Sequence, residues 1–210
     1  FNINYRLVPD VTVNQQLQDV AQALRWIRDH GSQYPCDMQN IMLTGDSAGG
    51  QLAAYSAVLM QSAQLRKTFD TVDPQMELTA LLLTSPVAFM RDGGLFSLYT
   101  KPMWGTDYKD KATYPYMDFD QIIDYAQALP PTYLITSSGD TLANKQTHRL
   151  YEVLQAHGVQ AEIKDYAKAE YNQSLPHVFS VLQPFEPAGT AAIDKALAFY
   201  QQAMTAKAAQ

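Results

Sequence analysis

Apolar and polar residues follow two periods along this chain, one of two residues and one of about 3.6. A period of two, or a short continuous apolar run, predicts strands in five ranges: 1–7, 40–44, 78–84, 132–138 and 159–166. The helical period predicts three helices, at 11–30, 142–157 and 190–204. Strands that alternate with helices are typical of right-handed βαβ crossovers. We therefore expect an α/β fold with a doubly wound, mostly parallel sheet and helices on both faces, in a single domain covering 1–210.

The helical ranges also predict which side chains face the core. In 11–30 one apolar stripe should be buried, Trp26 should lie beside it in the core, and Gly31 should end the helix. In 190–204 a second stripe should be buried, and Gly158 should close the helix 142–157. The first stripe consists of Leu17, Val20, Ala21, Leu24 and Ile27, and the second of Ile193, Ala196, Leu197 and Tyr200.

Residues 89–125 differ in composition from the rest of the chain. They hold nine aromatic residues, about twice the average density of 11%, and follow no sustained period. Two interpretations have equal support. The segment 89–128 is either an inserted lid or acyl-pocket wall, or an aromatic cluster that covers one end of the sheet.

Composition and charge narrow the function classes. The 210 residues are enough to bury a core, and 47% hydrophobic with 17% charged residues is typical of a globular protein. A formal charge of −6 without a Lys/Arg cluster argues against a nucleic-acid partner, and no run is long enough to cross a bilayer. The single cysteine, Cys36, allows no internal disulfide and favours a cytoplasmic location.

The most specific chemical motif lies where the apolar run 40–44 ends. It fits the pattern G-x-S-x-G, and an alanine-rich helix follows to about residue 61. A strand, a sharp turn and a helix around this pattern form a nucleophile elbow, which exposes the serine hydroxyl next to a helix N-terminus. Glycines two residues before and after the serine remove Cβ atoms where backbone segments cross. The predicted nucleophile is Ser47, and the elbow residues are Gly45, Asp46, Gly49 and Gly50.

A serine nucleophile needs a base, and the base needs an acid that orients it. In an open parallel sheet such groups collect beyond the carboxyl ends of the strands. Asp140 follows the strand 132–138, and His177 follows the strand 159–166. The order serine, aspartate, histidine is that of α/β-hydrolases, which predicts a triad with Ser47. Capping of the next helix is the alternative role of Asp140.

Other titratable residues have plain structural interpretations. Helix ends account for His30 and His157, where a cation meets the helix dipole, and an exposed helix face accounts for His148. Asp46 is interpreted as a carboxylate near the helix N-terminus that orders the site. Asp165 is the second choice for the acid of the triad.

Several segments resemble the hormone-sensitive-lipase-like esterases of the α/β-hydrolase superfamily. Residues 45–50 match that family's nucleophile motif G-D-S-A-G-G, and 5–10 (Y-R-L-V-P-D) look like its Y-R-L-A-P-E. Residues 19–26 are similar to its D-A…W helix, 140–142 match its acid motif D-x-L, and 177–179 match its H-x-F. The matches occur in the same order along essentially the whole chain.

This resemblance implies a serine esterase that cleaves carboxylic esters of small to medium acyl chains through an acyl-enzyme, without a cofactor. Ser47 would attack, and His177 would act as general base and then general acid. Asp140 would orient the imidazole, and the amide of Ala48 would bind the oxyanion. The expected partner is a small-molecule ester, and we assign no metal site. Exposed edge strands permit a homodimer without requiring one.

Two departures from the family pattern matter. The upstream segment H-G-G-G, which supplies oxyanion-hole donors in that family, is not among these residues. We expect it before Phe1 together with missing N-terminal strands, so that 1–210 would be the larger, C-terminal part of a hydrolase domain. In addition, 37 positions separate Asp140 from His177, somewhat more than in the family, and the excess falls in 168–176.

Two other functions stay open at this point. The same triad would serve an amidase, an arylformamidase or a peptidase, and turnover of anilides and formamides compared with p-nitrophenyl esters would distinguish these from an esterase. A non-catalytic small-molecule binder on the same fold would bind ligand without turnover. The presence of His177 favours the enzyme.

Overall fold

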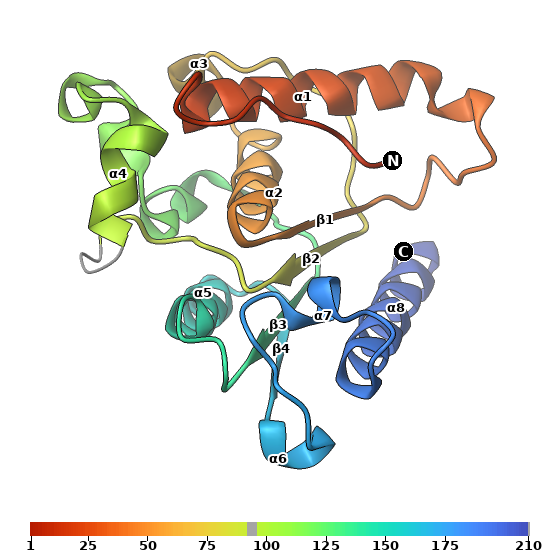
Figure 1. Ribbon diagram of the computed structural model, residues 1–210. Helices are drawn as coiled ribbons and strands as arrows, with labels where there is room; N and C mark the ends of the chain where they lie inside the picture. Colours follow the sequence, from red (N-terminus) through yellow and green to blue (C-terminus); the bar gives the residue numbers. More distant parts are fainter. Residues whose placement is uncertain (92–95, 210) are drawn as a thin grey trace. The chain divides into compact units, whose positions relative to one another are not determined.

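The computed structural model describes residues 1–91 and 96–209 (Figure 1). The chain forms two compact units. The first comprises 1–39, 55–77 and 89–128, and the second comprises 40–54, 78–88 and 129–210.

The second unit is built on a four-stranded parallel sheet with the order β1-β2-β3-β4. Its strands are β1 (Met42–Asp46), β2 (Ala80–Thr84), β3 (Thr132–Ser137) and β4 (Ala161–Tyr166). Each begins and ends within two residues of a predicted strand. Their carboxyl ends meet at one edge of the sheet, which is where the candidate site lies.

Helices cover both faces of this sheet, which confirms the predicted doubly wound α/β class. Figure 1 shows α5 (Asn144–Ala156) and α8 (Pro187–Ala208) on opposite sides of the strands. Two short helices, α6 (Lys168–Tyr171) and α7 (Phe179–Leu182), lie between β4 and α8 along the chain. Gly158 closes α5 as predicted, because its φ of +72° lets the Val159 N–H donate to the carbonyl of Leu154 at 3.0 Å.

The buried face of α8 agrees with the predicted stripe at Ala196 and partly at Tyr200, and differs from it at the other two positions. Ile193 and Leu197 are 38% and 47% exposed, whereas a row of small residues with one phenylalanine faces the sheet. Small side chains let the helix axis approach the sheet closely, so that Tyr133 and Ile135 of β3 fill the space instead. The buried row consists of Ala188, Gly189, Ala192, Ala196, Phe199 and Ala203.

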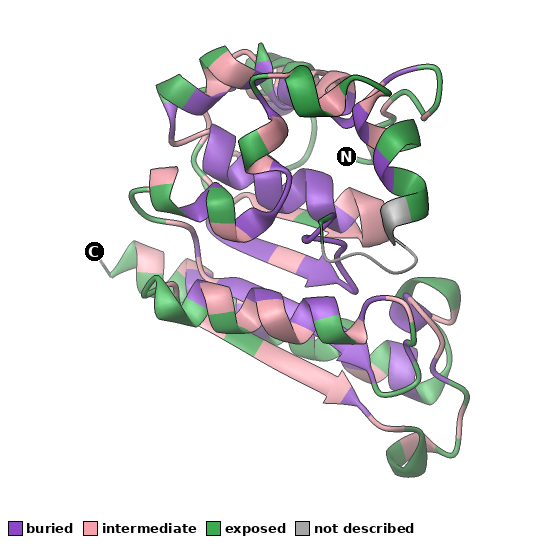
Figure 2. Ribbon diagram, turned by 90° about the vertical axis from the view of Figure 1, so that its left-hand side faces the viewer, coloured by how far each residue is buried: buried purple, intermediate pink, exposed green. Residues whose placement is uncertain are grey.

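The central strands are buried and the edge strands are not. All six residues of β3 are buried, and β2 is buried at four of its five positions. In contrast, β4 is largely intermediate or exposed, as its pink and green colours in Figure 2 show, and no residue of β1 is fully buried. Continuous apolar runs therefore correspond to central parallel strands, as expected.

The first unit is helical among its described residues. It contains α1 (Val13–His30), the end of α2 (Ser47–Leu59), α3 (Ala63–Phe69) and α4 (Phe96–Trp104). The predicted stripe of α1 is buried, and the helix begins where the Gln15 side chain accepts from the Thr12 N–H at 2.8 Å. Short 3-10 helices occupy Gly31–Gln33, Tyr108–Asp110, Tyr114–Tyr116, Phe119–Gln121 and Ile123–Tyr125.

Two sequence predictions in this unit are wrong. Residues 1–7 alternate in polarity but form no strand, because no described strand pairs with them, and Leu7 is 67% exposed. Trp26 is not a core residue either. It is 46% exposed and stacks on the imidazole of His30, with ring centroids 4.6 Å apart.

The aromatic segment 89–128 packs largely within its own unit. Phe89, Trp104 and Phe119 are almost fully buried, and the ring of Tyr55 contacts the last two at centroid distances of 6.4 and 6.1 Å. Residues 92–95 of the segment lie outside the described residues. Three of the nine aromatic residues thus fill an irregular core between short helices, whereas Tyr99 is 51% exposed.

Candidate active site

Ser47 lies at the junction of β1 and α2, in the geometry of a nucleophile elbow. Its φ is +50°, a left-handed conformation that is strained for a residue with a side chain. A Cβ atom on Gly45 would lie 2.3 Å from the carbonyl oxygen of Gly49, and one on Gly50 would lie 3.0 Å from the Cβ of Pro86. Both positions therefore require glycine for the turn to close.

The predicted reason for Gly49 is wrong. A Cβ atom built there meets no atom of the described residues within 4 Å. The second crowded glycine is Gly50, because the helix passes the loop after β2 at that position. Gly49 contributes to the turn through its carbonyl group, which leaves no room for a side chain on Gly45.

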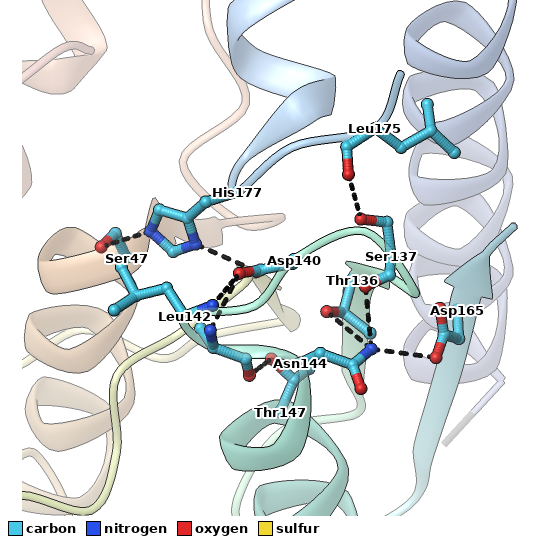
Figure 3. A network of polar contacts seen from close by, with 11 residues as sticks. Ser47, Thr136, Ser137, Asp140, Leu142, Asn144, Thr147, Asp165, Leu175 and His177 are labelled. Atoms are coloured by element: carbon cyan, nitrogen blue, oxygen red, sulfur yellow. Dashed lines mark hydrogen bonds and ion pairs between the residues drawn. The ribbon is translucent and has the colours of Figure 1, made fainter. Parts of the chain in front are cut away.

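The three residues of the predicted triad lie together, as Figure 3 shows. Nε2 of His177 is 2.9 Å from Oγ of Ser47, and Nδ1 is 3.0 Å from Oδ2 of Asp140. With the proton on Nδ1, the imidazole donates to the carboxylate and accepts from the serine hydroxyl. The His177 side chain is 24% exposed and that of Asp140 is fully buried, so the carboxylate is screened from water while the imidazole stays accessible.

Asp140 both orients His177 and caps the following turn. Its Oδ1 accepts hydrogen bonds from the N–H groups of Leu142 and Ala143, at 3.0 and 2.9 Å. Burial acts to raise the pKa of this carboxyl, but hydrogen bonds from His177 and the Ala143 amide, together with the nearby Ser85 hydroxyl group, outweigh burial and lower the pKa. The helix-capping role considered from the sequence is wrong in detail, because the N-cap of α5 is Ala143 and the Asp140 carboxylate instead binds the turn that precedes this helix.

Contacts between two loops hold the histidine next to the acid. The Ser137 hydroxyl donates to the carbonyl of Leu175 at 2.6 Å, two residues before His177. A Cβ on Gly139 would lie 2.5 Å from the same carbonyl oxygen. The excess residues in 168–176 form α6 and its flanking turns, so the longer loop still brings His177 to the acid.

Asp165, the second choice for the acid, contacts a different histidine. Its Oδ2 is 2.9 Å from Nε2 of His148 on α5 and accepts from the Asn144 side chain at 2.9 Å. Asn144 also donates to the carbonyl of Ser137 at 2.9 Å, so it joins β3, β4 and α5 (Figure 3). The sequence predicted an exposed helix face for His148 but not this pair, because the partner of His148 lies on a separate element, β4.

The remaining candidates occupy ordinary positions. Asp46 is the last residue of β1 and pairs with Thr84 in the sheet, and Ala48 follows Ser47 in the first turn of α2. The imidazoles of His30 and His157 donate from Nδ1 to carbonyls one turn earlier.

Among residues 1–91 and 96–209, no three acidic, histidine or cysteine side chains gather as metal ligands would. A membrane-spanning helix is likewise not found within that part of the chain.

A parallel sheet with helices on both faces, and a serine on a strained turn between its first strand and the next helix, is the architecture of an α/β-hydrolase. A comparison with protein families leads to the same class. Residues 1–174 match the family described as "alpha/beta hydrolase fold", and the chain belongs to this family, in its hormone-sensitive-lipase-like branch. The matched range includes Ser47 and Asp140 and ends three residues before His177.

Its relatives include esterases. The chain is 27% identical over 201 residues to the probable carboxylic ester hydrolase LipM of Mycobacterium tuberculosis, which covers 93% of this chain and 46% of LipM. It is similar in structure to esterase B of Lactobacillus rhamnosis, with a TM-score of 0.88 and 29% identity over 97% of this chain and 65% of that one. Esterase B inhibited by a C4-C4 tributyrin phosphonate gives a TM-score of 0.87 at 30% identity, covering 99% and 67%. The chain thus spans about half of LipM and about two thirds of esterase B.

Proposed function

We propose that this protein is a serine hydrolase that cleaves carboxylic esters of small to medium acyl chains through an acyl-enzyme. The observation that carries the proposal is the continuous relay from Ser47 through His177 to Asp140, with contacts of 2.9 and 3.0 Å. The esterase names of its relatives support the same reaction.

In the acylation step, Oγ of Ser47 attacks the ester carbonyl carbon while its proton passes to Nε2 of His177. The new Oγ–C bond places a negative charge on the former carbonyl oxygen. When the intermediate collapses, the bond to the alcohol oxygen breaks and the imidazolium returns the proton to that oxygen. Water then repeats the sequence on the acyl-enzyme, releases the carboxylic acid and restores the serine hydroxyl.

Asp140 and Ala48 act through charge. The buried carboxylate accepts from Nδ1–H, which fixes the tautomer of His177 and stabilises the imidazolium. The Ala48 N–H, at the start of α2, is the donor within these residues that we assign to the oxyanion, and the helix dipole adds to its effect. The family's H-G-G-G segment would supply further donors.

A tributyrin phosphonate inhibits esterase B, so butyryl esters are the first substrates to test. The segment 89–128 is proposed as a lid or acyl-pocket wall in the hydrolase domain. A homodimer formed through an exposed edge strand and a cytoplasmic location also remain proposals, the latter because Cys36 is the single cysteine.

The test is covalent labelling followed by turnover. A butyl phosphonate probe should label Ser47, identified by mass spectrometry of the digested protein, and should not label Ser47→Ala. Hydrolysis of p-nitrophenyl butyrate should be abolished in the same variant. Faster turnover of anilides or formamides than of esters would instead make the protein an amidase, and ligand binding by a folded, unlabelled protein would make it a binder.

A further inference from the structure

The segment 85–88, directly after β2, is bonded to three parts of the second unit. The Ser85 N–H donates to the carbonyl of Ile135 in β3 at 2.7 Å, and the Val87 N–H donates to the carbonyl of Ser47 at 3.2 Å. The Ala88 N–H donates to the buried side chain of Gln146 on α5 at 2.8 Å. This segment therefore links the turn that carries the nucleophile to the strand and helix that flank the acid.

Ser85 combines two unfavourable features. Its φ is +45°, a left-handed conformation that glycine adopts more readily. Its side chain is buried, with the residue 1% exposed, and its hydroxyl meets hydrogen-bond geometry with no atom of the described residues. A buried hydroxyl without a partner and a strained backbone both cost stability, and such costs concentrate at functional sites.

Two other strained residues of this unit adjoin the same site. Ser47 has a φ of +50°, and Val178, next to His177, has a φ of +51°. A β-branched residue in this region is a genuine outlier. The remaining described residue of this unit with a side chain at positive φ is Asn172, at +46°, and asparagine tolerates this region. The other three, Ser47, Ser85 and Val178, lie in or next to segments that carry or contact the triad residues.

We propose that the Ser85 hydroxyl is a positioning group for the acid of the triad, donating a hydrogen bond to the Asp140 carboxylate that keeps it aligned with Nδ1 of His177. Oδ1 of Asp140 already accepts from two backbone amides, whereas Oδ2 accepts one hydrogen bond, from His177, within the described residues. Oδ2 therefore has a lone pair free for a hydroxyl.

The electrostatics of the site support this role. The Ser85 hydroxyl is one of the groups that lower the pKa of Asp140 against the opposing effect of burial. Within the described residues, His177 is the one titratable side chain that contributes to that pKa, while Asp165 and His148 on β4 and α5 bond to each other. Hydrogen bonds in a resting active site are commonly long and shorten when charge develops. We infer that this one closes as the imidazolium forms.

Two variants separate the hydroxyl from the backbone strain. Ser85→Ala removes the hydroxyl and keeps a side chain at positive φ, whereas Ser85→Gly removes the hydroxyl and relieves the strain. The matched control is Ser56→Ala in α2, which deletes another buried hydroxyl without a partner, in the first unit. If the backbone strain alone mattered, the alanine variant, which keeps it, would behave as the wild type, and only the glycine variant would change. If the hydroxyl matters, both Ser85 variants share one defect.

The kinetic experiment rests on the proposed ester hydrolysis. With p-nitrophenyl butyrate we expect kcat to fall about tenfold in both Ser85 variants, with KM nearly unchanged, because a hydrogen bond to a charged group is lost in the transition state. The acid limb of the kcat/KM profile should move to higher pH, because the carboxylate without its donor binds protons more readily. Ser56→Ala should match the wild type in both respects.

A second measurement does not depend on turnover. In the proton NMR spectrum of the folded protein, the Nδ1–H of His177 should resonate at low field, and both Ser85 variants should shift it while Ser56→Ala does not. Wild-type protein without ester turnover would overturn the proposed function, and the NMR comparison would still decide the role of Ser85. An unshifted resonance, or wild-type kcat and pH profile in both Ser85 variants of an active enzyme, would overturn the inference.

Discussion

Two histidine–aspartate pairs lie on the second unit at the carboxyl ends of neighbouring strands. Asp140 follows β3 and contacts His177 at 3.0 Å, and Asp165 near the end of β4 contacts His148 at 2.9 Å. The side-chain groups and the distances are nearly the same. A histidine next to an aspartate is therefore not by itself a sign of catalysis.

The two pairs differ in burial and in their third members. The Asp140 side chain is fully buried, whereas those of Asp165 and His148 are 32% and 43% exposed. His177 uses its other nitrogen to contact Ser47, while the third member at the second pair is Asn144, which ties α5 to the sheet. A carboxylate in a buried, low-dielectric environment stabilises a protonated imidazole more strongly than an exposed carboxylate does. This stabilisation matters for catalysis when the imidazole accepts a proton from a nucleophile. We therefore propose a catalytic role for the first pair and a structural role for the second.

The largest expected difference lies between the two histidines. His177→Ala should lower kcat for p-nitrophenyl butyrate on the order of 10⁴-fold, because the base that accepts the serine proton is lost. His148→Ala should leave kcat within about twofold, because it removes a half-exposed side chain away from the reacting atoms. Steady-state kinetics on both variants, with circular dichroism to check folding, measures this. Equal losses in the two variants would show that the two pairs do not divide their roles in this way.

Substitution of Asp140 should likewise lower kcat more than substitution of Asp165, but the difference should be smaller than that between the two histidines. Asp140→Asn should lower kcat on the order of 10³-fold, since the amide neither stabilises the imidazolium nor enforces the productive tautomer. Asp165→Asn preserves shape and removes one charge as well, so it is the matched control and should retain nearly full activity. Single-turnover rates of acylation would locate the loss in the chemical step. A large loss in Asp165→Asn would mean that the Asn144 contact aligns the triad.

Much of the fold could be predicted because its central strands are buried on both faces. The run at 78–84 is nearly continuous in apolar residues and became β2, and 132–138, with Tyr133, Leu134 and Ile135 at its centre, became β3. The face of α8 could not be predicted in this way, because alanine fills the buried row and larger apolar residues face outward. The segment 1–7 has a strand-like pattern, but a pattern cannot supply the partner that a strand needs.

The positions of the triad residues could be predicted because topology places strand ends together, so the rule of carboxyl ends selected Ser47, Asp140 and His177 from the sequence. The Asp165–His148 pair and the environment of Ser85 could not be predicted, since both depend on side chains from elements far apart in the chain. For Ser85 the local signal even points the other way, because a residue before proline favours extended backbone, whereas Ser85 precedes Pro86 and has a φ of +45°.

The two pairs can also be compared through stability at acidic pH. The pKa of Asp140 is lowered in the folded protein, whereas aspartate in the unfolded chain has a pKa of about 3.9. At acidic pH the folded state therefore binds fewer protons at this carboxylate than the unfolded chain does. The resulting stabilisation is present above that pH and is lost as the pH falls through the lowered pKa. Asp140→Asn should therefore be less stable than the wild type at pH 7, with the gap closing below about pH 4.

Urea unfolding between pH 2.5 and 7 measures this gap, and Asp165→Asn controls for the loss of one negative charge. A gap for Asp140→Asn that stays constant over the whole range would contradict the lowered pKa. It would show that the destabilisation comes from packing of the amide and not from ionisation of the carboxylate.

The smallest effect is expected at the second pair itself. Both of its side chains are about a third or more exposed, so water and salt screen their attraction, and a double-mutant cycle should give a coupling free energy of about 0–1 kcal/mol between His148 and Asp165. Asn144→Ala should destabilise more than either single change at the pair, since it breaks bonds to Ser137 and Asp165 together. Urea unfolding of the cycle at low and high salt measures both. A coupling well above 1 kcal/mol that persists in high salt would mean that the second pair is effectively buried, and the contrast in burial between the two pairs would no longer explain their different roles.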